Sequence, residues 1–358
     1  MLKGISFFGV VHQSGGCGPE LLGALDLLQS KNIEVRCILP TGDKTVHGDR
    51  AQYLRSRGVE VLEYSPGLYS KCEVLMSFGE HLCFDYMRKN SDRPKRMVWS
   101  SCMSWAIDRE VEAFQDGLID EFFFQTERTA KKVSAQIKQR TQKDAPYRSG
   151  YLAFIDFSNP YAEYKAHISK LPTEFRVCKA VRDDSEKWHD ETWRMMCGVV
   201  APKNRKVQIE VAGWGSNARD KIGNPCDPSS KWSGMFDVIL HGHIVDPVEM
   251  AKLYGRSHVL LHYYPFIENY PRATLQAMLA NAVPVAEAKG GFLDQIEHGV
   301  TGFLANSPDE AAYYTSKLAF EKATWARMSK AAAKWVEKEG PGNPDKCWGW
   351  WEELLKNN

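Results

Sequence analysis

Residues 5–39, ISFFGVVHQSGGCGPELLGALDLLQSKNIEVRCIL, contain the pattern that predicts the fold. A short apolar run at Ile5–Val11 leads into a glycine-rich turn, and Pro19 then opens a helix in which leucines recur at helical spacing. Glu34–Leu39 is predicted as the next strand. A strand, a glycine loop, a helix and a strand in this order form a βαβ unit, which implies a parallel sheet.

The same alternation continues along the chain. Before residue 150 it predicts four strands and a helix with a basic face, namely Val59–Glu63, Val74–Ser77, Met97–Trp99, Glu121–Gln125 and the helix Glu127–Gln139. The pattern weakens between Tyr151 and Thr173, where Asn159-Pro160 breaks the chain. A second series follows, with strands at Phe175–Val181, Val207–Ala212, Phe236–Leu240, Val259–His262 and Val283–Ala286, and helices at Lys187–Met196, Arg272–Leu279 and Asp309–Leu355.

Two α/β domains follow from this organisation, because 358 residues are more than one ordinary compact core holds. We place a Rossmann-like domain at residues 1–165, a second one at residues 166–340 and a terminal helix at residues 341–358. In open parallel sheets, ligands bind outside the carboxyl ends of the strands. A ligand site is therefore expected in the loops that follow strands, in a cleft between the two domains.

The composition argues against a polyanion or a membrane as an obligatory partner. Charged residues make up 25% of the chain and the formal net charge is only +1. The nine cysteines are odd in number and lack a C-x-x-C pair, which favours reduced thiols over disulfides or a zinc cluster. The apolar stretch Met1–Val11 is too short to span a bilayer and lacks the features of a signal peptide. We therefore expect a cytoplasmic protein (in the host cytoplasm if viral) without stable membrane insertion.

Two loops carry residues suited to a phosphate group. Ser14–Gly18 is rich in glycine and precedes a helix, so its backbone can approach an anion, although an ordinary strand–helix turn has the same pattern. Arg182 and Lys187 lie five positions apart in the loop after Phe175–Val181. Arginine can grip a diphosphate with two parallel hydrogen bonds and lysine adds a compact charge, whereas the alternative is a solvated charged loop.

Two further regions follow later strands. The segment Glu268–Gln276, ENYPRATLQ, joins a strand to a helix whose exposed N–H groups can hold phosphate oxygens. Glu268 could accept hydrogen bonds from sugar hydroxyls and Gln276 could reach a ribose; alternatively, Glu268 only complements the helix dipole. Two glycine-rich turns, Ala288–Phe292 and His298–Phe303, complete the set and could equally be surface turns.

Taken together and in order, these loops resemble the retaining glycosyltransferases of family four, and the resemblance covers nearly the whole chain. That family carries an Arg and a Lys five or six residues apart, a Gly-x-Gly after the next strand, a Glu-x7-Glu element, an Ala-Met helix, a Pro-Val strand and further glycine turns. The matching positions are Arg182 and Lys187, Gly213 and Gly215, Glu268 and Gln276, Ala277-Met278, Pro284-Val285, Gly290-Gly291 and His298–Phe303, with Gly15-Gly16 as the N-terminal donor-phosphate loop.

The resemblance implies a GT-B fold, with two Rossmann-like domains facing across a cleft and a C-terminal helix that returns to the N-terminal domain. It also implies transfer of a sugar, with retention of configuration, from a UDP- or GDP-sugar that is a substrate and not a cofactor. The implied catalytic residues are Arg182, Lys187 and Glu268. The implied donor-binding residues are Gly15, Gly16, Gly213, Ile244, Tyr270, Arg272, Ala273, Thr274 and Gln276.

The chain departs from the family pattern in two places. Gln276 replaces the second Glu, whose carboxylate binds the donor ribose in that family; an amide accepts one hydrogen bond and donates another. The first domain also lacks a histidine after the strand Met97–Trp99. The acceptor-side candidates are His12, Glu80, His81 and Ser101. No Asp-x-Asp motif has a suitable strand context, and Asp183-Asp184 is expected to be solvated, so we predict transfer without a metal ion or cofactor.

The acceptor stays open at this point, with a carbohydrate as the default. DNA carrying 5-hydroxymethylpyrimidines is an alternative, because Gly16-Cys17-Gly18 resembles the loop of the phage α-glucosyltransferases that act on such DNA. Basic side chains of the first domain could then track phosphates, or could simply be solvated: Arg88, Lys89, Arg93, Lys95, Arg96, Lys131, Lys132, Lys138, Arg140, Lys143 and Arg148. Two rival functions also stay open, a sugar-nucleotide epimerase of the same fold and a nucleotide-binding module without turnover.

Overall fold

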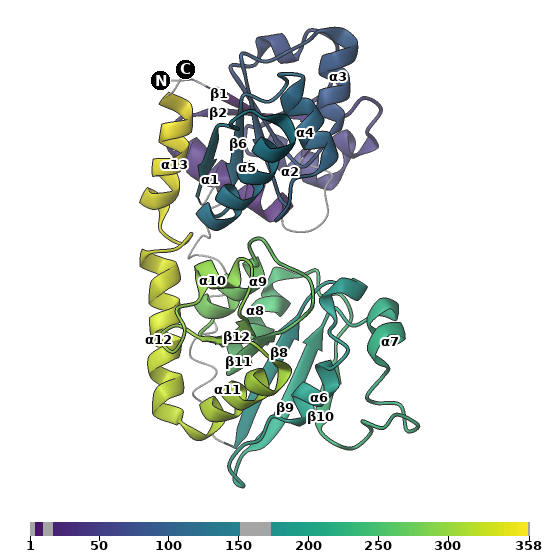
Figure 1. The fold of residues 1–358 in the computed structure, drawn as a ribbon, viewed down its shortest axis with the longest axis vertical. Helices are drawn as coiled ribbons and strands as arrows, with labels where there is room; N and C mark the ends of the chain where they lie inside the picture. The colour runs from purple at the N-terminus through teal and green to yellow at the C-terminus, as the bar shows by residue number, and fades with distance from the viewer. Residues whose placement is uncertain (1–3, 10–16, 151–172, 357–358) are drawn as a thin grey trace. The chain divides into compact units, whose positions relative to one another are not determined.

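The computed structural model describes residues 4–9, 17–150 and 173–356, and the chain divides into two compact units (Figure 1). Unit 1 comprises Met1–Ile155 together with Asn343–Asn358, and unit 2 comprises Asp156–Gly342. The domain boundary suggested by the sequence, between residues 165 and 166, lies outside the described residues. Each unit is built on a parallel sheet, which confirms the predicted pair of Rossmann-like α/β domains.

Unit 1 contains a seven-stranded sheet in the order β3-β2-β1-β4-β5-β6-β7. Its strands are β1 Gly4–Phe8, β2 Glu34–Leu39, β3 Glu60–Glu63, β4 Val74–Phe78, β5 Arg96–Ser100, β6 Glu121–Phe124 and β7 Tyr147–Ser149. Its α-helices are α1 Cys17–Ser30, α2 Asp49–Ser56, α3 Leu82–Asn90, α4 Asp108–Gln115, α5 Glu127–Thr141 and α13 Pro344–Lys356. Helix α13 thus belongs to the N-terminal unit, which confirms the predicted return of the C-terminal helix.

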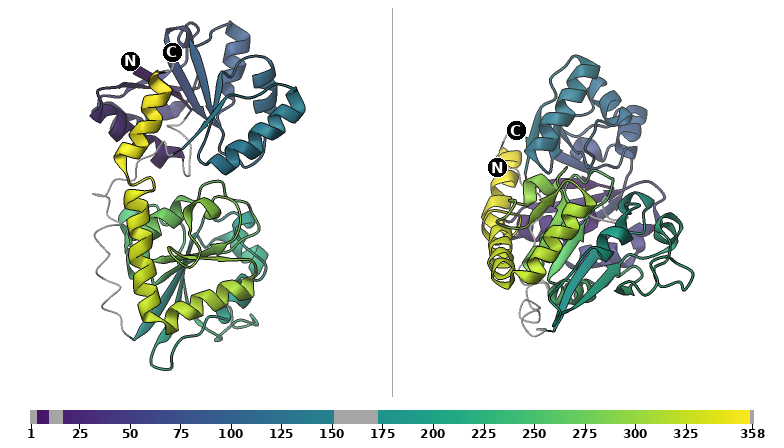
Figure 2. Two further views of the ribbon diagram at one scale, coloured as in Figure 1. Left: turned by 60° about the vertical axis from the view of Figure 1, so that its left-hand side comes forward. Right: turned by 60° about the horizontal axis from the view of Figure 1, so that its bottom comes forward.

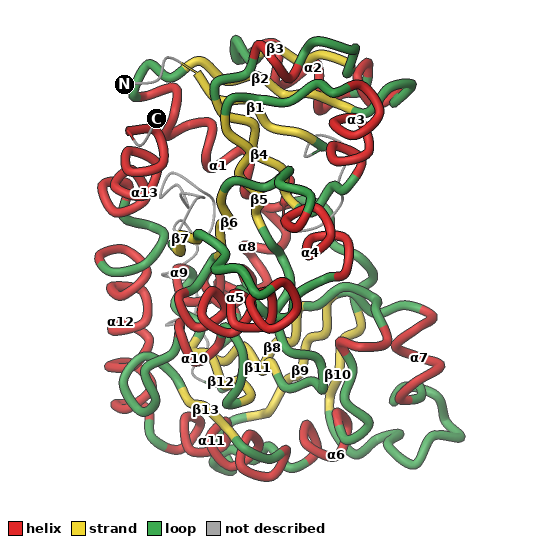
Figure 3. Tube along the Cα trace, turned by 45° about the horizontal axis from the view of Figure 1, so that its top comes forward, coloured by secondary structure: helices red, strands yellow, loops and turns green. Residues whose placement is uncertain are grey.

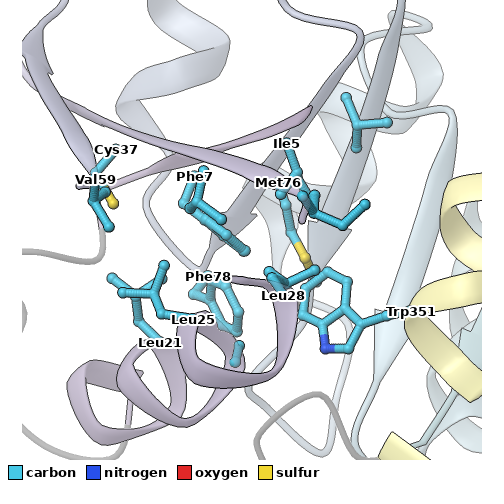
Figure 4. Close-up of a cluster of buried hydrophobic side chains, with 14 of the residues drawn as sticks. Ile5, Phe7, Leu21, Leu25, Leu28, Cys37, Val59, Met76, Phe78 and Trp351 are labelled. Carbon is cyan, nitrogen blue, oxygen red and sulfur yellow. The ribbon is translucent and has the colours of Figure 1, made fainter. Parts of the chain in front are cut away.

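The core of unit 1 forms on both faces of its sheet, because neighbouring side chains of a strand point to opposite faces. In β1, Phe7 packs in one hydrophobic cluster and Phe8 in another. Leu25 and Leu28 of α1 line the first cluster, as their helical spacing predicts (Figure 4). Helix α13 adds Trp351, which is completely buried and whose ring centroid lies 6.0 Å from that of Phe7. Unit 1 is therefore incomplete without the C-terminal helix.

Unit 2 contains a six-stranded sheet in the order β10-β9-β8-β11-β12-β13. Its strands are β8 Glu174–Ala180, β9 Lys206–Ala212, β10 Asp237–Leu240, β11 Val259–His262, β12 Val283–Glu287 and β13 Phe303–Ala305. Its α-helices are α6 Thr192–Cys197, α7 Ser216–Ile222, α8 Pro247–Arg256, α9 Arg272–Leu279, α10 Phe292–Gln295, α11 Pro308–Phe320 and α12 Lys322–Lys338. Helix α11 packs against α6 and α12, and α9 packs against α8 and α12 (Figure 2).

Strand order decides which loops of unit 2 become neighbours. Strand β8 pairs with β9 on one side and with β11 on the other, and all three strands are parallel (Figure 3). Their carboxyl ends therefore meet at one edge of the sheet, where ligands bind in folds of this kind. The segments that leave this edge are residues 181–187 after β8, residues 213–215 after β9 and residues 263–271 after β11.

The predicted helix Lys187–Met196 is wrong as a single element. A short 3₁₀ helix covers Ser185–Lys187, and α6 begins only at Thr192. Between them Trp188 is extended, with φ −117° and ψ 116°, and its side chain is completely buried. Burial of this large ring outweighs the helical propensity of the segment, because a buried tryptophan removes far more apolar surface from water than one turn of helix gains.

The long helical tail Asp309–Leu355 is three helices, α11, α12 and α13, in place of one. The first break falls at Glu321, with φ −99° and ψ 71°, and the second lies between Lys338 and Pro344, in a segment that contains two glycines and a proline. Helix α8 was not predicted, although Asp246 caps it through the Val248 amide and a proline opens it. None of the described helices is long and apolar enough to cross a membrane.

Candidate functional site

Three loops at the carboxyl edge of the unit 2 sheet carry most of the residues that the sequence singled out. The loop after β8 holds Arg182 and Lys187, the loop after β9 holds Gly213, and the loop after β11 holds Glu268. These loops start side by side because β8 lies between β9 and β11. The candidate site therefore lies at the carboxyl edge of the unit 2 sheet.

Lys187 and Glu268 form an ion pair, in which the Lys187 ammonium donates to Oε1 of Glu268. The Lys187 side chain is 8% exposed and that of Glu268 is 23% exposed. The Tyr264 hydroxyl lies 3.4 Å from the same carboxylate oxygen, and the Lys187 nitrogen lies 4.2 Å from the centroid of the Phe266 ring. The structure thus brings two of the three predicted catalytic residues into direct contact, against aromatic rings and partly open to solvent.

Arg182 has a more exposed position. Its guanidinium lies 3.0 Å from the carboxylate of Asp184, and its side chain is 61% exposed. An ion pair of this exposure contributes about 0–1 kcal/mol to stability. The guanidinium can therefore exchange Asp184 for another anion at little energetic cost.

Asp183 corrects an expectation from the sequence, because its carboxylate is not simply solvated. Its two oxygens accept hydrogen bonds from the backbone amides of Asn217 and Ala218, at 3.2 and 2.8 Å, in the first turn of α7. A carboxylate in this position satisfies amides that have no partner inside the helix. Gly215 is required beside it, since a Cβ there would lie 2.1 Å from an Asp183 carboxylate oxygen.

Gly213 allows the loops after β8 and β9 to touch. Its φ is +85°, and a Cβ added to it would lie 1.6 Å from the carbonyl oxygen of Val181. Its amide donates to the carbonyl of Gly242 at 3.0 Å, which ties the loop to the segment that carries half-buried Ile244. Gly213, predicted as a donor-binding residue, is therefore needed first for loop–loop contact.

The Gly290-Gly291 turn has a similar packing role, which its interpretation as a family motif or a surface turn did not include. A Cβ on Gly290 would lie 2.3 Å from the carbonyl oxygen of Glu268, and one on Gly291 would lie 2.1 Å from that of Asn269. The Gly291 amide donates to the Glu268 carbonyl at 2.8 Å. The double glycine thus holds the backbone of the candidate catalytic carboxylate.

The first turn of α9 presents the remaining donor-side candidates. Pro271 precedes the helix, so its N-cap residue has no side-chain acceptor for the first amides. The side chain of Thr274 is completely buried, and its hydroxyl has no hydrogen-bond partner within the described parts of the chain. Tyr270, Arg272, Ala273 and Gln276 are all half-buried. Gly15, Gly16 and His12 lie outside the described residues.

Two titratable residues behind the site were missed at the sequence level. Lys179 near the end of β8 is completely buried, and its burial, followed by the charge of Lys187, lowers its pKa to about 7. Nε2 of His262 lies 3.1 Å from the Ala180 carbonyl oxygen. Burial, followed by the charge of Lys179, lowers the pKa of this histidine to about 3. Strand alternation could have found Lys179, because it follows Phe175 and Val177 on the same face.

The acceptor-side candidates lie in unit 1. The Ser101 hydroxyl donates to Glu110 at 3.1 Å, and burial raises the pKa of that carboxyl. The His81 ring centroid lies 4.8 Å from that of Trp99, and burial, followed by the charge of Arg109, lowers the pKa of the histidine. Glu80 accepts a hydrogen bond from the Leu82 amide at 3.2 Å. Glu110 was not predicted, and its position three residues into α4 gives no distinct signal.

Most of the basic side chains proposed to track a DNA backbone are paired with acidic ones. Arg96 and Arg148 both contact Glu121, and Arg88 and Arg93 contact Asp116 and Asp120. The other ion pairs of this group are Lys95–Glu73, Lys131–Glu127, Lys138–Asp144 and Arg140–Asp108. Arg96 and Arg148 would gain little from a phosphate, because Glu121 is only 10% exposed and would be left unpaired. The other pairs are exposed, like Arg182–Asp184, and a phosphate could separate them at little cost.

The described residues contain no group of three or more His, Cys, Asp or Glu side chains arranged to hold a metal ion. Asp183 and Asp184, the adjacent acidic pair nearest the site, are engaged with α7 and with Arg182. The prediction that no metal ion is needed stays a prediction.

Comparison with known proteins places a family match on unit 2. Residues 178–319 match the model of the family described as glycosyl transferases group 1. No curated protein sequence matches the chain. The matched segment contains Arg182, Lys187, Gly213, Glu268 and all of α9, so it covers the donor-side candidates of this unit. The glycosyltransferase group 1 domain confirms the prediction of a glycosyltransferase enzyme.

Solved structures resemble the chain over its whole length. A crystal structure of HepE from Anabaena in complex with UDP is 14% identical, with a TM-score of 0.74 and coverage of 100% of both chains. A glycosyltransferase from Rickettsia africae is 13% identical, with a TM-score of 0.72 and the same coverage. Sucrose-phosphate synthase from Thermosynechococcus elongatus is 14% identical, with a TM-score of 0.71 and coverage of 99% of this chain and 100% of its own. At these identities the likeness shows the fold, and it confirms the GT-B architecture.

Proposed function

We propose, from the premise that residues 178–319 form a glycosyltransferase group 1 domain, that this chain transfers a sugar from a UDP-sugar to an acceptor hydroxyl in the cytoplasm. The transfer is proposed to retain the anomeric configuration and to need no metal ion. The observation that carries the proposal is the half-buried Lys187–Glu268 pair at the carboxyl edge of the sheet. Uridine is preferred to guanosine because HepE is described in complexes with UDP and with UDP-glucose.

Lys187 and Arg182 are the proposed partners of the donor diphosphate. Both are cations that the free protein neutralises with a carboxylate, Glu268 for Lys187 and Asp184 for Arg182. A diphosphate brings more negative charge than either carboxylate and can recruit both cations from their present partners. The amides at the start of α9 and the buried hydroxyl of Thr274 would complete this grip.

The chemistry follows from that grip. The bond between the anomeric carbon and the diphosphate oxygen breaks, and the nucleoside diphosphate leaves with the electron pair. The acceptor oxygen bonds to the anomeric carbon on the same face, and its proton passes to the departing phosphate oxygen. Lys187 and Arg182 stabilise the charge that develops on the leaving group, which is the kind of preorganised electrostatic effect that accelerates reactions most.

Glu268 is proposed to bind the transferred sugar. When the diphosphate takes over Lys187, the carboxylate becomes an acceptor for sugar hydroxyls, and the Gly290-Gly291 turn keeps its backbone in place. A carboxylate accepts such bonds strongly because it is charged. Gln276, on the same helix as Thr274, is proposed to face the donor ribose with a neutral amide.

A carbohydrate is the proposed acceptor. The pairing of Arg96 and Arg148 with the nearly buried Glu121 withholds these two cations from a DNA backbone and favours a carbohydrate. Ser101, His81 and Glu80 stay the proposed acceptor-side residues of that unit. DNA with 5-hydroxymethylpyrimidines and free-sugar production by an epimerase are the outcomes that an acceptor test must separate.

The first test is a donor panel of UDP-, GDP- and ADP-sugars, with binding read by thermal shift and turnover by release of nucleoside diphosphate. Arg182→Ala should lower turnover on the order of a hundredfold, because one preorganised charge is lost. Arg194→Ala is the matched control, since Arg194 is also exposed and paired, with Glu191 and Asp309. Near-normal turnover of Arg182→Ala would remove Arg182 from the site.

The second test identifies the acceptor and the stereochemistry. Mass spectrometry would compare sugar acceptors with hydroxymethylated DNA, and proton NMR of the product would give the anomeric configuration. Product formed without any acceptor would favour an epimerase, and an inverted product would contradict the proposed retention.

A further inference from the structure

Lys179 is a buried cation that the proposed chemistry does not use. It lies near the carboxyl end of β8, its exposure is 0%, and its ammonium nitrogen has no hydrogen-bond partner among residues 4–9, 17–150 and 173–356. An ammonium group in this condition is costly, because it loses its hydration without a replacement. A methionine or leucine would fill the same position in the core without that cost. The residue therefore calls for a functional explanation.

The surroundings of Lys179 lead directly to the candidate site. Its nitrogen lies 4.9 Å from the centroid of the Tyr264 ring and 5.3 Å from that of Trp188. The Lys187 nitrogen lies 5.3 Å from the same Tyr264 centroid, and the Tyr264 hydroxyl lies 3.4 Å from Glu268. The amino groups of Lys179 and Lys187 thus both lie close to the Tyr264 ring, whose hydroxyl contacts Glu268.

The charges around Lys179 explain why its protonation state can change when a ligand binds. Lys187 is the cation that faces it, and Glu268 balances Lys187 in the free protein. His262 on β11 is close enough for the charge of Lys179 to act on it, and that histidine stays neutral near pH 7. Tyr264 is a buried phenol and is neutral in the same range. An additional anion at the site would therefore raise the fraction of Lys179 that is protonated and charged.

We propose that Lys179 takes up a proton when the donor diphosphate binds, so that its buried charge adds to the binding of the donor and makes that binding depend on pH. The inference rests on the proposed function, because it takes a nucleoside diphosphate as the ligand. No bond other than the N–H bond forms, and the proton comes from the solvent. Lys179 acts through the field at the site and is a positioning residue, since the rings of Tyr264 and Trp188 cover it.

The direction of the effect follows from linkage. Burial and Lys187 lower the pKa of Lys179 to about 7, so the side chain is largely neutral at pH 8 in the free protein. A bound diphosphate raises that pKa, and the complex then holds more protons than its separated parts. Affinity for UDP is full below the free pKa and falls by up to about tenfold per pH unit as the pH rises from 7 toward the pKa of the complex.

The same residue lowers the stability of the free protein. Its folded pKa lies below the ordinary lysine value, so folding expels a proton at pH values between the two. The cost is complete below pH 7 and disappears as the pH rises through the ordinary lysine pKa. Lys179→Met should therefore raise the melting temperature at pH 7 while it weakens UDP binding. A residue with a purely structural role would lower stability when it is replaced.

The experiment is isothermal titration of the full chain with UDP at pH 7, 8 and 9, all above the second pKa of the phosphate. Titrations at pH 8 in HEPES and in Tris give the number of protons taken up. The unaltered protein should take up as much as about one proton per UDP, and Lys179→Met should take up none beyond the background. The Lys179→Met variant should bind UDP about tenfold more weakly than the unaltered protein at pH 7, and the two affinities should become equal at pH 9.

Two further variants keep the result interpretable. Lys179→Gln provides a second neutral side chain if the methionine variant is poorly folded, and Lys206→Met replaces an exposed lysine of β9 that pairs with Asp237 and should change neither quantity. Equal proton uptake in the unaltered protein and the Lys179 variants would overturn this inference alone. Absence of any nucleoside diphosphate binding by the unaltered protein would overturn the proposed function, and this inference with it.

Discussion

Two carboxylates, Glu268 after β11 of unit 2 and Glu110 in α4 of unit 1, are held in opposite ways. Glu268 in unit 2 pairs with Lys187 and keeps a 23% exposed side chain. Glu110 in unit 1 is 1% exposed and accepts its hydrogen bond from the neutral hydroxyl of Ser101. The first carboxylate is charge-matched and reachable, whereas the second is buried beside a neutral partner. The difference indicates that unit 2 presents a ligand group, while Glu110 mainly orders the loop between β5 and α4.

Loops of the two units also differ in their backbone contacts. In unit 2, Gly213, Gly290 and Gly291 each bring one loop into contact with the backbone of another. In unit 1, a Cβ added to Gly9 after β1 would lie 2.5 Å from side-chain atoms of Glu80 and not from a backbone, and one added to Gly117 would meet no heavy atom within 4 Å. Loops that interlock through main-chain contact cannot move independently. The donor-side loops should therefore respond to substitution as one body.

The largest effect is expected from Gly213→Ala. The new methyl group would overlap the Val181 carbonyl oxygen and face a φ of +85°, so we expect a loss of stability on the order of 3 kcal/mol or more, together with loss of nucleotide binding. Gly117→Ala in unit 1 is the matched variant, because its φ is +70° but nothing lies within 4 Å. The Gly117→Ala substitution should lower the free energy of unfolding by only about 1 kcal/mol. Urea denaturation of both proteins measures the difference, and equal costs would show that the loops do not interlock.

The next effect concerns Glu268→Ala. Removing the carboxylate takes away the proposed sugar contact and leaves the nearly buried Lys187 without its partner. We expect turnover to fall at least about a hundredfold, while the fold is kept. Glu321→Ala is the control, since this glutamate forms an exposed ion pair with Lys317 far along the chain. Steady-state kinetics on both variants would refute the assignment if Glu268→Ala were nearly silent.

A smaller effect is expected for Gln276, the residue at which the chain leaves the family pattern. Neutral hydrogen bonds contribute roughly 0.5–1.5 kcal/mol, so Gln276→Ala should weaken UDP binding about tenfold or less. Gln276→Glu should be tolerated and could tighten binding, because a carboxylate accepts from both ribose hydroxyls. Calorimetric titration with UDP checks both variants. Loss of all activity in Gln276→Ala, with Glu268→Ala unaffected, would exchange the roles of the two residues.

Glu110→Gln should have a modest effect that depends on pH. Burial raises the pKa of Glu110 in the folded protein, so the unfolded chain releases this proton first as the pH rises above the ordinary glutamate value. The ionised form therefore lowers stability above that value, and glutamine removes the cost while it still accepts from Ser101. We expect the variant to match the parent protein at low pH and to be up to about 1 kcal/mol more stable at pH 7. A variant that is less stable at pH 7 would show that the charge is compensated.

The smallest effect is expected from chelation. An assay in excess EDTA should proceed at an unchanged rate, since Arg182 and Lys187 supply the positive charge that a metal ion would otherwise bring to the diphosphate. The control is the same assay with the chelator saturated by calcium. Complete loss of turnover, restored by manganese or magnesium, would mean that the donor is bound differently.

Much of the fold and part of the site could be predicted from the sequence. Strand β11 and helix α9 lie at the predicted residues, because an unbroken apolar run and a proline-led helix start leave few alternatives. The sequence singled out Lys187 and Glu268 separately but did not predict their contact. Strand order brings the two residues together across 81 positions of sequence. The broken helix at Trp188 and the cap at Asp183 depend on tertiary packing, which local patterns do not contain.

The placement of α13 in unit 1 has a consequence for biosynthesis. Trp351 packs against Phe7 in the core of unit 1, although all of unit 2 is synthesised between these two residues. Unit 2 is continuous in sequence and can fold as soon as it leaves the ribosome, whereas the core of unit 1 stays unfilled until α13 emerges after it. The usual order of co-translational folding, N-terminal domain first, is thereby reversed. Until α13 emerges, the unfilled core of unit 1 exposes apolar surface that can aggregate or bind chaperones.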